Sequence, residues 1–275
     1  MKNRPAKSQK TKLLNSAASL TTGSKVLDAL FGGPGLLTGQ TYELYGPEGA
    51  GKSTLLHQLV CTAFLPPSRG GLAAGSIYID AEGTFSPRHL REHAGRFRID
   101  PDALLRRILK ATPVTVDILL EICENQLESK AVQVGARLLC LDSIGTHFRA
   151  EYGEEVYCMP ERDQKVRRVL AALQRVATRV NGVAIYTNSL APVSQWQGSR
   201  RPWNAPVLNG VQRISVWVQQ DPAKSRLFQR MEGSTPSVHE CQVRLGDLGF
   251  TDPPPPRARK GPLDRGIKKT IKPLS

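Results

Sequence analysis

The sequence GPEGAGKST, residues 46–54, decides how the rest of the chain is interpreted. It matches the pattern G-x-x-x-x-G-K-[ST] at every fixed position. Glycines let the backbone curl so that successive N–H groups point at phosphate oxygens, and the start of the following helix adds partial positive charge. Lys52 is expected to reach the β- and γ-phosphates, and Ser53 to ligate magnesium. The predicted nucleotide-binding residues are Gly46, Pro47, Glu48, Gly49, Ala50, Gly51, Lys52, Ser53 and Thr54.

The segments around this loop have the patterns of strands and helices. A strand is predicted over residues 40–45, which enter the loop, and a helix over residues 52–64, which leave it. Runs such as LLCLD, residues 138–142, are apolar on successive residues, which is typical of parallel strands covered on both faces. Further strands are predicted over 76–80, 104–110, 137–142, 183–188, 213–218, 227–231 and 238–244, and further helices over 24–31, 87–97, 115–129 and 160–180.

The order of these elements predicts an α/β fold. Strands that alternate with helices form a twisted, mostly parallel sheet with helices on both faces. The last three predicted strands have no helices between them, so we expect them to form an antiparallel extension at one edge of the sheet.

Two acidic residues follow predicted strands and are candidates for ATP chemistry. Asp142 ends the strand LLCLD, and the carboxyl ends of neighbouring parallel strands meet where such sheets bind ligands. We expect Asp142 to hold magnesium through water, although a helix-capping role is the alternative. Glu82, in DAEGT, is expected to polarise a water for attack on the γ-phosphate, with an ordinary strand-to-helix turn as the alternative. Lys52 and Glu82 are therefore the predicted catalytic residues.

Length and charge place the chain among globular proteins that meet polyanions. Its 275 residues are 40% hydrophobic and 23% charged, and no apolar stretch is long enough for a transmembrane helix, so no membrane partner is expected. Of the net charge of +14, +5 lies in residues 1–12 and +5 in residues 251–275. We expect a basic flexible arm over 1–19, a core over 20–250 and a proline-rich, then basic, flexible tail over 251–275. Such arms favour nucleic acids, and a solubility tail or nuclear-import signal is the alternative.

A second candidate DNA contact lies within residues 195–203, QWQGSRRPW. Aromatic rings stack on bases while arginines neutralise phosphates, a combination typical of single-strand binding. The alternative is a loop whose tryptophans pack on a partner subunit. The candidate DNA-binding residues are Trp196, Arg200, Arg201 and Trp203.

Four segments together resemble the core of the RecA/RadA recombinase family, in its eukaryotic and archaeal branch. They are residues 20–59, 76–90, 137–152 and 181–193. The resemblance implies a RecA-like P-loop NTPase core that binds ATP and Mg²⁺ at subunit interfaces. It implies that Asp142 is the acidic residue of the family's second nucleotide-binding motif and that Glu82 is the catalytic carboxylate. It also implies that Asn188 and Ser189 lie in the γ-phosphate sensor region. It also implies that residues 149–162 and 189–210 form the first and second DNA-facing loops.

Departures from the family pattern favour an accessory recombinase paralogue. The family's N-terminal DNA-binding domain and its Phe-x-x-Ala hook are expected to be missing, and Asn188-Ser189 replaces the usual Asn-Gln. We expect a weak DNA-stimulated ATPase in homologous recombination and double-strand break repair. Its expected partners are single-stranded or branched DNA and other recombinase-family subunits in a hetero-oligomer.

Alternatives remain open at this point. A scaffold subunit that holds ATP without hydrolysing it is one, and a small-molecule kinase is another, disfavoured because the arginine-bearing loop does not resemble a kinase lid. A nuclear location is expected, with mitochondria as the alternative because no acidic residue precedes Asp28.

Overall fold

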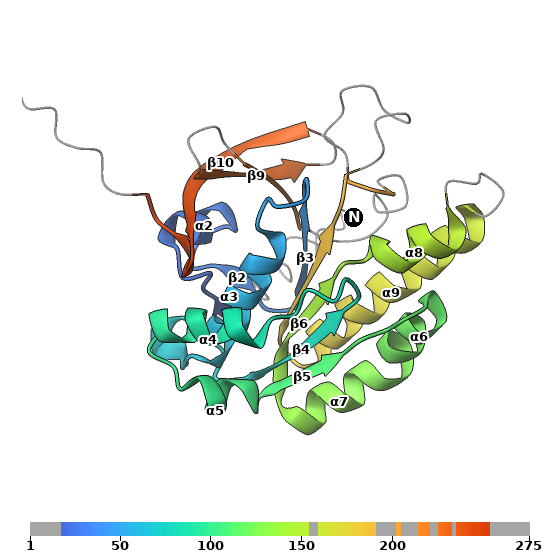
Figure 1. The fold of residues 1–275 in the computed structure, drawn as a ribbon, viewed down its shortest axis with the longest axis horizontal. Helices are drawn as coiled ribbons and strands as arrows, with labels where there is room; N and C mark the ends of the chain where they lie inside the picture. The colour runs from blue at the N-terminus through green and yellow to red at the C-terminus, as the bar shows by residue number, and fades with distance from the viewer. Residues whose placement is uncertain are drawn as a thin grey trace, which may run out of the picture.

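A nine-stranded sheet forms the centre of the described part of the protein (Figure 1). The structure, a computed structural model, describes residues 18–153, 159–190, 202–204, 214–220, 225–232 and 235–253. The strand order is β11-β10-β9-β8-β3-β7-β6-β4-β5. These strands are β3 (Gln40–Tyr45), β4 (Gly75–Asp80), β5 (Ile108–Ala111), β6 (Ala136–Asp142), β7 (Val183–Asn188), β8 (Ile214–Gln220), β9 (Ser225–Glu232), β10 (Thr235–Gly246) and β11 (Gly249–Thr251).

Helices cover both faces of this sheet, as the sequence predicts. One face carries α2 (Lys25–Leu30), α3 (Lys52–Phe64), α4 (Pro87–Arg96) and α5 (Pro101–Leu105), and the other carries α6 (Val116–Glu121), α7 (Leu127–Val134), α8 (Gly145–Tyr152) and α9 (Met159–Arg179). In β6, Leu138 and Cys140 face the first layer, while Leu139 and Leu141 face the second. All four side chains are fully buried, which explains why the strand is apolar at every position. The predicted α/β fold is confirmed.

The edge of the sheet differs in one respect from the prediction. β8, the first of the last three predicted strands, pairs in parallel with β3 and antiparallel with β9. The antiparallel extension therefore begins at β9 and continues through β10 and β11. A separate two-stranded sheet of β1 (Ser19–Leu20) and β2 (Leu36–Leu37) lies outside the predicted elements.

Local capping explains two further corrections. The strand predicted over residues 104–110 begins only at Ile108, because Asp100 caps the N-terminus of α5 and Pro101 occupies its first position. The helix predicted over residues 115–129 continues to Val134 and ends at Gly135, whose φ of 61° breaks the helix. A π-helical turn, Ile122–Gln126, interrupts it, and α8 was not among the predicted helices. In the described ranges, no helix has the length and apolar character needed to cross a bilayer.

The first and last described segments are joined through α3. The buried Gln58 side chain donates to the carbonyl oxygens of Thr22 and Phe250 and accepts from the N–H of Phe250. Asp252 accepts from the hydroxyl of Ser24 and from the first backbone N–H groups of α2. Burial raises the pKa of Asp252, but these hydrogen bonds together lower it by more than burial raises it, so the net shift is downward. The body of the described protein thus includes Asp252.

A buried histidine on α3 makes stability depend on pH. His57 is 2% exposed, stacks on Tyr78 with ring centroids 5.5 Å apart, and has no hydrogen-bond partner for Nε2 within the described residues. Burial, above all, lowers the pKa of His57 to about 4, from 6.5. The unfolded chain therefore binds a proton that the folded chain does not, and stability should fall as the pH drops from about 6.5 toward 4. At about 1.4 kcal/mol per pKa unit, the loss reaches about 3 kcal/mol.

The variant His57→Phe keeps the stacking and removes the titration. Urea denaturation at about pH 7 and about pH 5 should show a smaller difference for this variant than for the wild type. A matched control is His147→Gln, because His147 bonds the carbonyl oxygen of Pro113 and is only partly buried. Equal pH dependence of His57→Phe and the wild type would contradict this prediction.

Candidate nucleotide-binding site

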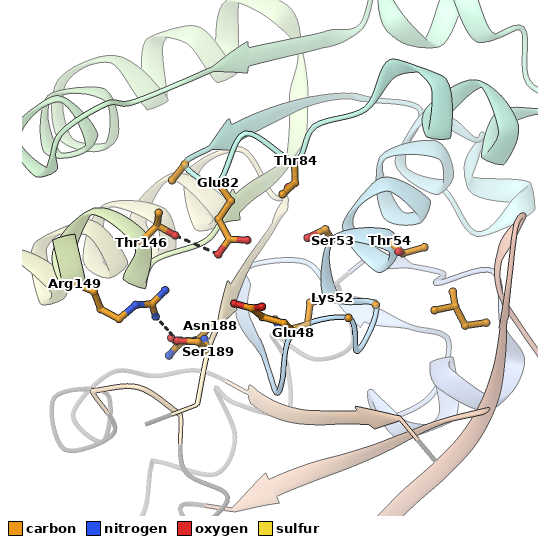
Figure 2. Close-up of a pocket in the computed structure, with 14 residues that line it drawn as sticks. Glu48, Lys52, Ser53, Thr54, Glu82, Thr84, Thr146, Arg149, Asn188 and Ser189 are labelled. Carbon is orange, nitrogen blue, oxygen red and sulfur yellow. Dashed lines mark hydrogen bonds between the residues drawn. The ribbon is translucent and has the colours of Figure 1, made fainter. Parts of the chain in front are cut away.

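A cavity of about 560 Å³ opens at the carboxyl ends of β3, β4 and β7 (Figure 2). Parallel strands bring these three ends to one edge of the sheet, which is where α/β sheets bind ligands. The cavity is lined by Glu48, Gly49, Gly51, Lys52, Ser53, Thr54, Ala81, Glu82, Thr84, Thr146, Arg149, Asn188, Ser189 and Leu245. Most of the loop predicted to bind phosphate therefore borders the same space as the predicted catalytic carboxylate.

The loop after β3 is shaped by close packing as much as by glycine flexibility. At Gly46 an added Cβ would lie 2.0 Å from the carbonyl oxygen of Val218, so β8 leaves no room for a side chain. Gly51 has φ of 98° at the start of α3, and an added Cβ there would lie 2.8 Å from the ring of Phe250. The chain therefore turns sharply into α3, whose first residues line the cavity. A helix N-terminus that opens into a polar cavity suits a phosphate group.

Lys52 contributes a positive charge at this end of the cavity. Its Nζ donates to the carbonyl oxygens of Gly46 and Pro47, both at 2.9 Å. Burial lowers the pKa of Lys52, whereas the carboxylates of Glu82, Asp142 and Glu48 raise it. Lys52 therefore lies within electrostatic reach of both acids that the sequence singles out.

Glu82 is presented by a turn that Asp80 holds in place. Asp80, at the end of β4, accepts from the N–H groups of Thr84 at 2.9 Å and Phe85 at 3.3 Å. Glu82 Oε1 accepts from the hydroxyls of Ser143 at 2.7 Å and Thr146 at 3.2 Å. Within the described residues Oε2 has no hydrogen-bond partner, which leaves an acceptor that suits a water molecule.

Asp142 lies behind the wall of the cavity and does not line it. It is 1% exposed, and its carboxylate accepts from the hydroxyls of Tyr78, Thr84 and Thr187. Thr84 does line the cavity, so it connects Asp142 to that space. Both oxygens of Asp142 already have donors, and its contact with magnesium through water stays a prediction.

The two residues expected to sense the γ-phosphate differ in how they face the cavity. The buried Asn188 side chain donates to Glu43 Oε1 at 2.9 Å and to the carbonyl oxygen of Trp203 at 3.1 Å. Its Oδ1 accepts from the N–H of Ser189, also at 2.9 Å. The amide of Asn188 is therefore used inside the protein, whereas the hydroxyl of Ser189 accepts from Arg149 at the cavity wall.

Helix α8 supplies two cavity residues that the sequence-based site did not include. Thr146 and Arg149 are one helical turn apart, so they lie on the same face of α8. The interpretation of residues 149–162 as a loop is wrong at both ends, because Arg149 lies on α8 and Arg162 on α9. In the sequence GTHFR, the threonine and the arginine stand three residues apart, and this spacing is the pattern from which their shared helix face could have been predicted.

Trp203 is a buried anchor in this structure. It is 6% exposed, and its ring lies 6.3 Å from that of Phe148. The guanidinium groups of Arg149 and Arg162 lie 5.9 and 5.4 Å from its centre. These neighbours cover the ring, so the position of Trp203 does not support the expectation that it stacks on a base. The other candidate DNA contacts lie outside the described residues: Trp196, Arg200 and Arg201.

Comparisons with known proteins add an independent line of information. A family model described as Rad51 matches residues 14–253. The chain is 37% identical over 176 residues to the DNA repair and recombination protein RadA of Metallosphaera sedula, a match that covers 64% of this chain and 53% of that protein. It is 30% identical over 243 residues to the meiotic recombination protein DMC1 of Saccharomyces cerevisiae, covering 85% of this chain and 71% of that protein. The aligned part thus spans about half the length of the first of these relatives.

Proposed function

The chain belongs to the Rad51 family, as the resemblance in its sequence predicts, and on that premise we propose that it is a DNA-dependent ATPase of DNA repair and recombination. The observation that carries the proposal is the shared cavity, in which Lys52 and Ser53 at the start of α3 face the carboxylate of Glu82 (Figure 2). This donor set fits a nucleoside triphosphate with magnesium, because it combines a helix N-terminus, an ammonium, hydroxyls and carboxylates.

Each residue has a role in this proposal. The loop from Gly46 to Gly51 cradles the phosphates, Lys52 contacts the β- and γ-phosphates, and Thr54 extends the nucleotide contact. Ser53 holds magnesium directly and Asp142 through water, and the ion, when bound, neutralises phosphate charge. Glu82 accepts a proton from the attacking water through the carboxylate oxygen that Ser143 and Thr146 leave unbonded.

We further propose that the chain acts as an accessory paralogue. Its partners are single-stranded or branched DNA and other recombinase-family subunits, and its location is nuclear. The names of the two relatives support the process, because one is a DNA repair and recombination protein and the other a meiotic recombination protein. The concentration of positive charge in residues 1–12 and 251–275 supports contact with nucleic acid.

One observation favours a second function, that of a scaffold which holds ATP without hydrolysing it. The amide of Asn188 bonds Glu43 and Trp203, so it does not offer a donor to a γ-phosphate. A subunit in which nucleotide state is weakly sensed would still use bound ATP to stabilise its fold.

The change Lys52→Ala tests the nucleotide site. Loss of a charge-assisted contact worth about 1.5–3 kcal/mol should weaken ATP binding roughly ten- to hundredfold, measured by fluorescence titration with a labelled ATP. Lys130→Ala is the matched control, because Lys130 is exposed on α7 and donates a hydrogen bond to Gln133 on the same helix. Unaltered affinity in Lys52→Ala would remove the site assignment.

Phosphate release measured with and without single-stranded DNA tests the DNA dependence of the ATPase. An equal rate of release with and without DNA would contradict that dependence.

A further inference from the structure

Arg149 brings a second positive charge to the nucleotide cavity. It lies on α8, across the cavity from Lys52 and Ser53, and on the same side as Glu82 and Ser189 (Figure 2). Its Nη1 donates to the hydroxyl of Ser189. All these groups come from one chain.

Within the described residues, Arg149 forms no ion pair with a carboxylate. Other arginines in the same layer are paired, Arg162 with Asp163 at 3.0 Å and Arg168 with Glu124. A guanidinium is always protonated, and holding it partly buried without an anion is costly. Two cations that oppose each other across one cavity are arranged for an anion between them.

The structure holds Arg149 in this position. Its guanidinium lies over the ring of the buried Trp203 at 5.9 Å. An added Cβ at Gly145 would lie 2.7 Å from Arg149 Nη1 and 3.2 Å from the Trp203 ring, so the glycine that begins α8 leaves space for the arginine. With one N–H engaged by Ser189, the planar fork has donors left for a ligand.

We propose that Arg149 contacts the terminal phosphate of the bound nucleotide and makes the site prefer triphosphate over diphosphate. This inference rests on the proposed function, because it takes the cavity to be the ATP site. The loop and α3 hold the nucleotide from one side, so the groups opposite them, Arg149 and Glu82, meet its terminal phosphate. A diphosphate ends short of Arg149 and does not gain from its charge.

The experiment compares binding of ADP with that of a non-hydrolysable ATP analogue, each with Mg²⁺, by calorimetry on the full chain. Arg149→Met keeps the apolar stem over Trp203 but removes the charge. It should weaken analogue binding roughly ten- to hundredfold while ADP affinity stays within about twofold. Arg149→Lys, which keeps the charge but loses the fork, should retain part of the preference. Arg179→Met is the control, because Arg179 is exposed at the far end of α9.

The possible outcomes separate this inference from the function on which it rests. If the wild type binds neither nucleotide, the proposed function fails and the inference fails with it. If the wild type binds both and the ratio of affinities is the same in Arg149→Met, the nucleotide site stands but Arg149 has no part in selecting triphosphate. Equal loss of both ligands would also overturn the inference, because it indicates a structural role. Should Arg149→Met fail to fold in thermal melting, the ratio in Arg149→Lys decides, and an unchanged ratio there overturns the inference.

Discussion

Replacing Glu82 with glutamine is expected to lower ATP turnover by roughly two to four orders of magnitude while nucleotide affinity changes little. Glutamine has nearly the same shape, and its amide oxygen can still accept from Ser143 and Thr146. What it lacks is the second carboxylate oxygen, which has no partner in the described residues and serves as the proton acceptor. The loss should therefore appear in the chemical step.

Steady-state phosphate release with single-stranded DNA measures this effect, and titration with a labelled nucleotide measures binding. Glu92→Gln is the matched control, because Glu92 lies on α4 and pairs with the exposed Arg88. Turnover at the same background rate in the wild type and in Glu82→Gln would instead favour the non-hydrolysing scaffold. If the wild type hydrolyses ATP and Glu82→Gln keeps a similar rate, another group accepts the proton.

Replacing Asp142 with asparagine is expected to reduce the free energy of unfolding by about 2–3 kcal/mol. Three hydroxyls, from Tyr78, Thr84 and Thr187, donate to this buried carboxylate. An asparagine places an NH₂ donor against one of these groups, so that at least one buried donor loses its acceptor. Because the side chain is 1% exposed, water cannot replace the lost bond.

Urea denaturation measures the loss, and Asp117→Asn provides the control, since Asp117 is exposed and bonded to Lys165 at 3.0 Å. Nucleotide affinity should fall as well, because Thr84, which Asp142 holds, lines the cavity. Unchanged stability would contradict the prediction that the hydroxyl bonds to Asp142 support the fold. Unchanged nucleotide affinity in a stable variant would argue against any link from Asp142 to the cavity.

Sequence patterns predicted the parts of the fold that depend on local order. β3, α3 and β7 begin and end at the predicted residues, because apolar runs and the loop motif fix them locally. Arg149 and Thr84 could not be assigned in this way, since they meet the cavity only when strand ends distant in sequence come together. For a related reason, the sequence could not show that Trp203 is buried. Aromatic and basic residues in combination serve base stacking and internal packing equally well, and only its contacts with Phe148 and Arg162 distinguish the two.

The contacts of Gln58 have a mechanical consequence. α3 begins beside the nucleotide cavity. About two turns further along the same helix, Gln58 donates hydrogen bonds to Thr22 and Phe250, which lie near the first and last described residues. A small rotation of α3 when the ligand is exchanged would therefore move the backbone near Thr22 and near Phe250 at the same time. Spectroscopic labels attached near Ala18 and Pro253 would therefore both report a change of ligand at the phosphate loop.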